Sequence, residues 1–368
     1  MMTNKSAFLL SAVFFAALCL ADEAAKDVFY YGADISALSK VESLGGEFKD
    51  SAGSPADAME LFAENGWNCA RLRLFVNPNG KGAVVNDLEY TLKLAERAKK
   101  AGMDLLIDLH YSDTWADPGH QNKPEAWESL DFYRLREKVE SYTAEVIKSF
   151  CDKGICPEMV QIGNEINPGF LWPEGRIKWK EEKSWLRFAH LIKAGIRGVR
   201  KASPEGKRIK TVIHTALGGN TAATKTFFDY MEKYRVDYDV IAQSCYPWWH
   251  GTLEEIGENL KFMAGRYDKQ IIIAETAYPR KENFSKGKGS WTEERMAWPM
   301  TEEGQAQFLA QLVKTAKSTP DGKCIGIFYW YPESINVKGM HTWMNAAMAM
   351  FDKNGKALEA LKTPLKHK

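Results

Sequence analysis

The feature that most restricts the fold is a regular alternation of short apolar runs with longer amphipathic segments. Eight runs are predicted to be β-strands, at residues 28–36, 68–76, 103–112, 159–166, 210–217, 240–247, 271–279 and 325–333. Most are apolar throughout, which is typical of strands covered on both faces. Amphipathic helices are predicted between them, most clearly at 87–102, 131–150, 184–202, 253–267 and 302–318.

Eight strands alternating with helices, without a low-complexity linker, predict an α/β protein that forms a single (β/α)8 TIM barrel. The length of 368 residues is normal for such a barrel with insertions. An open, doubly wound sheet is the alternative architecture. No Gly-x-Gly-x-x-Gly motif follows the first predicted strand, however, and many doubly wound dinucleotide-binding folds carry that motif there.

The first 21 residues are expected to be a secretory signal peptide. Lys5 precedes sixteen uncharged residues, too few for a typical membrane-spanning helix, and cleavage after Ala21 would leave residues 22–368 as one barrel domain. The alternative is a lipid anchor on Cys19, but Leu18 before it is larger than the usual small residue. We therefore expect a secreted, periplasmic or cell-surface protein with no transmembrane segment in its mature chain.

Removal of the signal peptide leaves five of the six cysteines, so at least one is unpaired within a monomer. Cys151 and Cys156 are close enough in sequence to form a disulfide, although the segment between them resembles a helix end and a turn. The sequence alone therefore does not decide whether this disulfide forms. Cys69, Cys245 and Cys324 lie on predicted strands and are expected to be small buried residues.

Charge and aromatic content narrow the class of ligand. The 49 Lys and Arg residues nearly balance the 48 Asp and Glu residues, so nothing favours a nucleic-acid partner. The 12 Trp residues favour a carbohydrate, because sugar-binding clefts use aromatic faces as stacking platforms. Any single Trp can equally be a large core residue. We expect the chain to act as a monomer.

Polar and aromatic residues gather where the predicted strands end. In a (β/α)8 barrel these carboxyl ends meet on one face, which carries the active site. We therefore expect one binding cleft there. Its candidate residues are Arg71, Arg73, His110, Asp113, Asn164, Glu165, His214, Tyr246, Glu275 and Trp330.

Two of these residues are glutamates that follow apolar runs, Glu165 in "QIGNEINPG" and Glu275 in "IIIAETAYP". A carboxylate at the end of a buried strand is costly unless it is paired or used. Two carboxyl groups facing each other suit glycosidic-bond hydrolysis, with one protonated as an acid and the other ionised. Asn164, directly before Glu165, is placed to hydrogen-bond a sugar 2-hydroxyl.

The surroundings of Glu275 admit a structural and a catalytic interpretation. An ion pair with Arg71 or Arg73 would explain its burial. The same guanidinium would lower the pKa of Glu275 and keep it ionised, as a nucleophile requires. A hydrogen bond from the Tyr246 hydroxyl would act in the same direction.

The segment "HYSDTWADPGH" raises a metal alternative, because His110, Asp113, Asp117 and His120 are all potential ligands. Their spacing matches no zinc motif. A polar loop that lines the cleft, with Trp115 as a platform for a sugar ring, is favoured. No metal and no cofactor are expected.

The motifs "HYSDTWADPG", "IGNEINPGFLWPEG" and "AETAYP" together resemble the family 53 glycoside hydrolases, the endo-β-1,4-galactanases. The resemblance runs from about Tyr30 to Leu361. It implies a clan A (β/α)8 barrel and a retaining mechanism, with Glu165 as general acid/base and Glu275 as nucleophile. It also implies a β-1,4-galactan substrate from pectin side chains or type I arabinogalactan.

The resemblance assigns further residues to the site. Arg71 corresponds to the arginine near the nucleophile. His110, Asp113 and Trp115 fall in the cleft-lining loop, and Trp330 matches the tryptophan under the sugar that is cleaved. Some bacterial members bind calcium. This sequence shows no clear cluster of Asp and Asn ligands for it, so calcium binding is left as an open alternative.

The chain departs from the family pattern at two strand ends. His214 is followed by "TALGGN" in place of an acidic, Trp-containing stretch, and "WYPE" moves the expected acid to Glu333. Two other functions stay open. One is hydrolysis of another β-1,4-glycan, mannan or glucan, by the same two glutamates. The other is a non-catalytic galactan-binding barrel.

Overall fold

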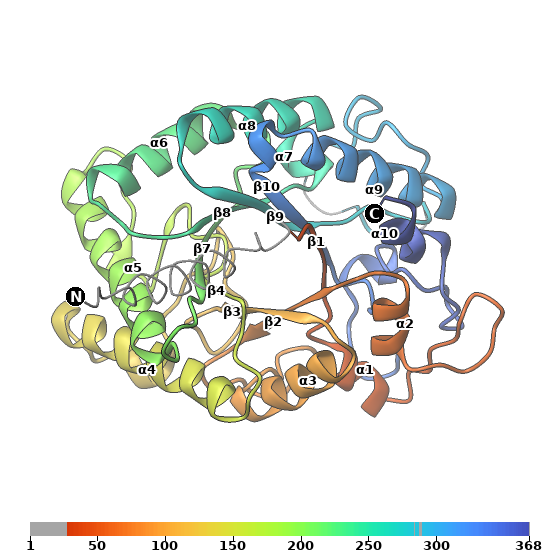
Figure 1. Cartoon of the computed structure of the whole chain (residues 1–368), viewed down its shortest axis with the longest axis horizontal. Coiled ribbons are helices and arrows are strands. Elements are labelled where there is room, and N and C mark those ends of the chain that lie inside the picture. Colours follow the sequence, from red (N-terminus) through yellow and green to blue (C-terminus); the bar gives the residue numbers. More distant parts are fainter. Residues whose placement is uncertain (1–27, 283, 287–288, 368) are drawn as a thin grey trace, which may run out of the picture.

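The computed structural model describes residues 28–282, 284–286 and 289–367. The predicted signal peptide, its cleavage site and Cys19 lie outside these residues. The chain forms a closed barrel of eight parallel strands in the order β1-β10-β9-β8-β7-β4-β3-β2 (Figure 1). The barrel strands are β1 (Tyr30–Asp34), β2 (Cys69–Leu74), β3 (Asp104–Leu109), β4 (Met159–Ile162), β7 (Lys210–Thr215), β8 (Val240–Ser244), β9 (Gln270–Thr276) and β10 (Cys324–Trp330).

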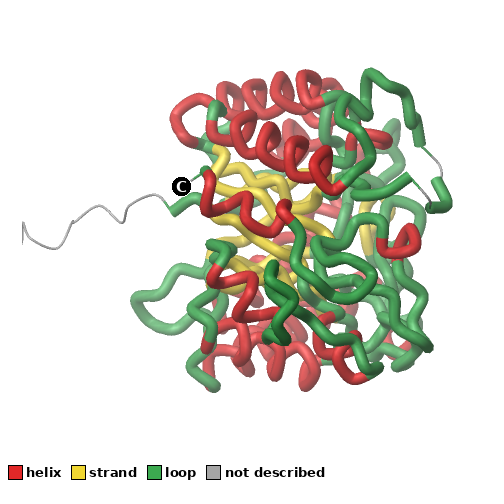
Figure 2. Tube along the Cα trace, turned by 90° about the vertical axis from the view of Figure 1, so that its right-hand side faces the viewer, coloured by secondary structure: helices red, strands yellow, loops and turns green. Residues whose placement is uncertain are grey.

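Helices cover the outside of the barrel, and much of the loop chain gathers at one end of it (Figure 2). The α-helices are α1 (Leu38–Ser43), α2 (Ala58–Glu64), α3 (Leu88–Lys100), α4 (Phe132–Asp152), α5 (Glu182–Ala202), α6 (Thr221–Lys233), α7 (Pro247–His250), α8 (Leu253–Arg266), α9 (Glu302–Lys317) and α10 (Thr363–Lys366). The short 3-10 helices are η1 (Glu125–Trp127), η2 (Pro320–Gly322), η3 (Trp343–Ala346) and η4 (Glu359–Lys362). A small hairpin, β5 (Gly169–Phe170) with β6 (Gly175–Arg176), follows β4.

The eight predicted strands and the five predicted helices are confirmed, and so is the single (β/α)8 barrel. The predicted strands run past the observed ones at their carboxyl ends. After β4, Gly163 and Glu165 both adopt positive φ, so the chain leaves the extended conformation before the predicted end at residue 166. At the helix starts, Asp87 accepts a hydrogen bond from the Tyr90 amide, as a capping residue does.

The barrel interior is packed by its own small cluster of side chains, separate from the larger core between strands and helices. Gly32 on β1 faces Phe328 on β10, and a Cβ atom at Gly32 would lie 1.9 Å from the Phe328 ring. This position therefore requires a residue without a side chain.

Gly32→Ala is expected to lower the free energy of unfolding by about 1–3 kcal/mol, because overpacking a closed barrel displaces neighbouring strands. Gly265→Ala is the matched control, since a Cβ atom there meets nothing within 4 Å and alanine favours the α8 helix. Urea unfolding of both variants measures the difference. Equal stability of the two variants would contradict the close packing at Gly32.

The cysteines divide into one disulfide and three buried thiols within the described residues. Cys151 at the end of α4 bonds to Cys156. Cys69, Cys245 and Cys324 are free and buried, as predicted. In the part of the chain that the structure describes, no helix is both long and apolar enough to cross a membrane.

Candidate active site

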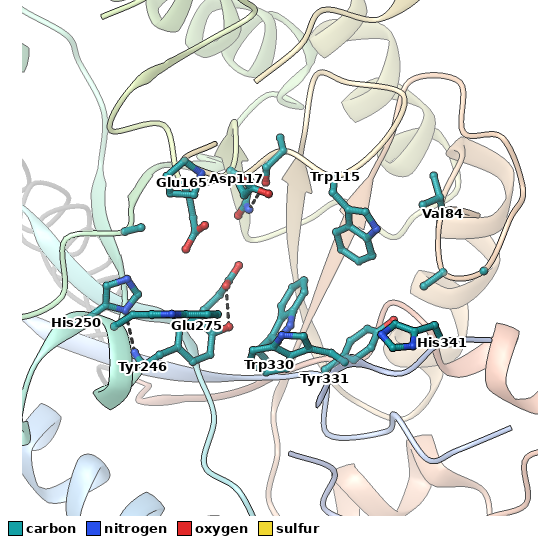
Figure 3. Close-up of a pocket in the computed structure, with 18 of the residues that line it drawn as sticks. Val84, Trp115, Asp117, Glu165, Tyr246, His250, Glu275, Trp330, Tyr331 and His341 are labelled. Carbon is teal, nitrogen blue, oxygen red and sulfur yellow. Dashed lines mark hydrogen bonds between the residues drawn. The ribbon is translucent and has the colours of Figure 1, made fainter. Parts of the chain in front are cut away.

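A cleft of about 990 Å³ opens at the carboxyl ends of the barrel strands. Glu165 follows β4 and Glu275 lies on β9, and their carboxyl groups point toward each other across the cleft (Figure 3). The cleft is also lined by Trp115, Asn164, Tyr246 and Trp330. Six of the predicted site residues therefore line one cavity, although they come from five different strand ends.

The other five predicted site residues do not line the cleft. Four of them are buried beneath it, where they contact the lining residues or their neighbours: Arg71, Arg73, His110 and His214. Asp113 lies in the loop after β3, and its carboxylate accepts hydrogen bonds from the amides of Asn77 and Glu125. As described, Asp113 joins two loops, in contrast to the cleft-lining position expected from the sequence.

Arg71 is the hub of a buried ion-pair network under the cleft. Its Nη1 lies 2.9 Å from Asp34 Oδ2 and 3.0 Å from Glu275 Oε1. Its Nη2 donates to Asp108 Oδ2 and to Asn164 Oδ1, both at 2.9 Å. A buried guanidinium is tolerable only when its charge and its donors are satisfied in this way. The network thereby holds Glu275 and Asn164 in place from below.

Glu275 is held by two groups that favour its ionised form. Arg71 pairs with one carboxyl oxygen, and the Tyr246 hydroxyl donates to the other at 2.9 Å. Arg71 and the Tyr246 hydroxyl each lower the pKa of Glu275, as predicted, but they do not bring it below its ordinary value. Burial raises the pKa of Glu275, and the facing Glu165 adds to the rise, because a second negative charge in a desolvated cleft is unfavourable.

Glu165 has no cationic partner within ion-pair distance among the described residues. Burial raises the pKa of its carboxyl group, and the nearby Asp117 adds to the rise. The backbone of Glu165 has a φ of 49°, a left-handed conformation that costs energy for a residue with a side chain. Backbone strain of this kind is commonest at functional sites, where it aims a side chain. Here it accompanies a carboxyl group that points into the cleft.

The four residues of the metal alternative are all engaged in contacts with other protein groups. His110 Nε2 lies 3.0 Å from Asp108 Oδ2, and its Nδ1 accepts from the Ala116 amide. Asp117 pairs with His120. Among residues 28–282, 284–286 and 289–367, no group of three or more His, Cys, Asp or Glu side chains is arranged to hold a metal ion.

Three aromatic rings of the cleft meet at one buried cation, Arg73. Its guanidinium lies 4.4 Å from the Trp115 ring centre, 5.5 Å from that of Trp330 and 5.3 Å from that of Tyr331. Arg73 pairs with Asp34 at 3.5 Å, whereas Glu275 pairs with Arg71. Cation–π attraction between Arg73 and these rings helps to hold the aromatic side of the cleft.

Trp115→Ala is expected to weaken about tenfold the binding of the galactan ligand that the sequence resemblance implies, because the half-buried ring lines the cleft and offers a face for sugar stacking. The melting temperature should fall modestly, since the ring also packs edge-on against Phe75. Trp179→Ala, at an exposed tryptophan outside the cleft lining, is the control. Isothermal titration with galacto-oligosaccharides measures both variants, and unchanged affinity in Trp115→Ala would assign Trp115 to packing alone.

Several lining residues escaped the sequence analysis. Tyr331, His341, Trp343, Trp249 and His250 all face the cleft. Trp249 and His250 follow directly after a predicted strand, a position that could have marked them. Trp343 and His341 lie more than ten residues beyond the last strand, and only the path of the chain brings them back.

The model of the family described as glycosyl hydrolase family 53 matches residues 30–363. The chain belongs to glycosyl hydrolase family 53. A solved family 53 catalytic domain from Ignisphaera aggregans superposes with a TM-score of 0.84 at 35% identity, covering 93% of this chain and 97% of that one.

Curated relatives of this family 53 chain carry an activity in their names. An arabinogalactan endo-β-1,4-galactanase from Cellvibrio japonicus is 33% identical, covering 97% of this chain and 96% of the relative. A probable arabinogalactan endo-β-1,4-galactanase A from Aspergillus terreus is 37% identical, covering 82% of this chain and 85% of the relative. The match thus extends over 85% or more of both relatives.

Proposed function

We propose that the chain is an endo-β-1,4-galactanase that hydrolyses internal bonds of pectic galactan and type I arabinogalactan. Membership of family 53 and the names of its relatives support the substrate. The observation that carries the chemistry is the facing pair of buried glutamates, one paired with a guanidinium and the other not. Export, which the predicted signal peptide favours, and a role in pectin degradation, which the proposed substrate favours, are both part of this proposal.

In the proposed mechanism Glu275 is the nucleophile. Arg71 and the Tyr246 hydroxyl stabilise negative charge on its carboxylate, so the single charge of the glutamate pair resides there. Glu275 attacks the anomeric carbon while Glu165 gives its proton to the leaving glycosidic oxygen. The product of this step is a covalent galactosyl-enzyme.

The second step uses the same two residues with the role of Glu165 reversed. The leaving sugar departs with the proton, so Glu165 is now a carboxylate and accepts a proton from water as the water attacks the anomeric carbon. Glu275 leaves, and the anomeric configuration is retained overall. Trp330 and Trp115 offer the aromatic faces for the sugar rings, and Asn164 faces the cleft beside the acid.

The test is release of reducing ends from linear β-1,4-galactan, with β-mannan and β-glucan in parallel. We expect release from galactan and at most traces from the other two polysaccharides. Release chiefly from mannan or glucan would identify that polysaccharide as the substrate, and the proposed two-glutamate mechanism would still apply. Binding of galactan without release from any of the three would favour a non-catalytic binding barrel.

A further inference from the structure

Four consecutive hydrogen-bonding contacts connect Arg71 to the carboxyl group of Glu165. The residues between these two take no part in the bond changes of the proposed reaction. The contacts join Arg71 to Asn164, Asn164 to His214, His214 to Ser244 and Ser244 to Glu165. All five side chains are buried. Because each link offers either a donor or an acceptor, the direction of one hydrogen bond determines the direction of the next.

The amide of Asn164 has one possible orientation. A guanidinium can only donate, so the Asn164 atom 2.9 Å from Arg71 Nη2 must be the oxygen. A carbonyl can only accept, so the atom 2.8 Å from the Ala116 oxygen must be the amide nitrogen. Both ends of the amide therefore agree, and Asn164 presents an acceptor to His214.

The orientation of Asn164 determines the tautomer of His214. His214 Nδ1 lies 2.9 Å from Asn164 Oδ1, an acceptor, so Nδ1 carries the proton. The Glu165 amide also points at Nδ1, but from 3.4 Å, a weaker contact. Burial and the nearby Arg71 lower the pKa of His214 well below its usual value, so the ring is neutral. Its Nε2 is then an acceptor.

The acceptor at Nε2 sets the last two hydrogen bonds. Ser244 Oγ, 2.9 Å from Nε2, donates its only proton to the ring. Ser244 Oγ also lies 2.6 Å from Glu165 Oε1, to which it would donate if its proton were free. With that proton on the His214 ring, Ser244 has only a lone pair to offer to Glu165. A carboxylate would face this lone pair without a proton between them, whereas a protonated carboxyl group donates to it.

We infer that Ser244 and His214 are positioning residues that hold Glu165 in its protonated form by presenting it with a hydrogen-bond acceptor. This inference rests on the proposed function, in which Glu165 is the acid. It extends that function by assigning the protonation of the acid to a relay that starts at Arg71. The same guanidinium thus favours the charge on Glu275 directly and the proton on Glu165 indirectly.

Other ionisable groups also act on Glu165, and the test must separate them from Ser244. Glu275 on β9, Asp108 on β3 and Asp117 in the loop after β3 disfavour its negative charge, whereas Arg71 on β2 favours it. His214 is neutral, and burial raises the pKa of Tyr246 well above its usual value, so neither contributes charge near neutral pH. Ser244→Ala leaves all of these charges unchanged.

The direction in which the pKa of Glu165 shifts in Ser244→Ala shows whether Ser244 accepts a hydrogen bond from Glu165 or donates one to it. A group that accepts from the protonated form raises the pKa of Glu165, so its removal in Ser244→Ala should move the alkaline limb of kcat/KM down by about one pH unit. A group that donates to the ionised form lowers the pKa, so its removal would move the limb up. Thr215→Val removes a buried hydroxyl from the residue next to His214 and is the control, because that hydroxyl contacts Gln243.

The measurement should include a readout that does not depend on activity. Carbon-13 NMR of glutamate-labelled protein, with the Glu165 signal assigned by Glu165→Gln, follows the carboxyl titration directly. We expect the midpoint of Glu165 to fall in Ser244→Ala and in His214→Ala, where Ser244 is free to turn and donate to the carboxylate, and to stay in place in Thr215→Val. A Glu165 midpoint that rises or does not change in Ser244→Ala would contradict the inference that Ser244 accepts a hydrogen bond from Glu165. Failure of the wild type to cleave galactan would instead count against the proposed function. The titration would still show the direction of the hydrogen bond between Ser244 and Glu165.

Discussion

Glu275→Gln is expected to reduce hydrolysis of β-1,4-galactan by at least about 10⁴-fold, the largest effect of any single substitution considered for this chain. The amide has nearly the shape of the carboxyl group but cannot attack the anomeric carbon. Arg71 keeps its contacts with Asp34 and Asp108, so the variant should fold and still bind galacto-oligosaccharides. Reducing-end assays and isothermal titration of the same preparation measure the two properties.

Glu333→Gln is the matched control for Glu275→Gln. Glu333 follows β10, is fully buried near the same end of the barrel, accepts a hydrogen bond from the Ala37 amide and does not line the cleft. Its substitution should leave turnover of galactan within a few-fold of wild type. If both variants lost activity equally, the loss would reflect damage to the barrel mouth, and the assignment of the nucleophile would fail.

Glu165→Ala is expected to slow cleavage of galactan by about 10²–10⁴-fold, because the leaving glycosidic oxygen then departs without a proton. A galactoside with a dinitrophenol leaving group needs little protonation, so its first step should be nearly as fast as in the wild type. The second step lacks its general base, and the galactosyl-enzyme should accumulate. A rapid burst of dinitrophenol followed by slow turnover is therefore the expected time course.

Azide provides the corresponding rescue of Glu165→Ala. It attacks the galactosyl-enzyme without needing a base, so it should restore turnover of the activated substrate and yield a galactosyl azide of retained configuration. Glu158→Ala is the control, because Glu158 precedes β4 at the opposite end of that strand and pairs with Lys99. Equal losses on galactan and on the activated substrate would contradict the role of Glu165.

Much of the fold was predictable from local pattern. Strands buried on both faces must be apolar throughout, and amphipathic helices must show one apolar face, so the alternation was legible without any tertiary information. The disulfide was not predictable in this way. The segment from Cys151 to Cys156 does contain a helix end and a turn, and it is the geometry of that turn that brings the two Cα atoms to 4.0 Å.

The sequence predicted which residues lie near the candidate site better than it predicted which groups their side chains contact. Strand ends meet on one face, so Glu165, Glu275, Tyr246 and Trp330 could be grouped from the topology alone. Whether each side chain turns toward the cleft could not be predicted. Asp113 turns toward the amides of two loops, for example.

The sequence by itself determined the barrel, the two strand-end glutamates and, through its motifs, the family. Only the tertiary structure decided which glutamate is paired with a guanidinium. Arg71 lies on β2 and Glu275 on β9, and Ser244 is 79 residues from Glu165. A pKa depends on burial and on neighbouring charges and hydrogen bonds, and these neighbours are brought together only when the barrel closes.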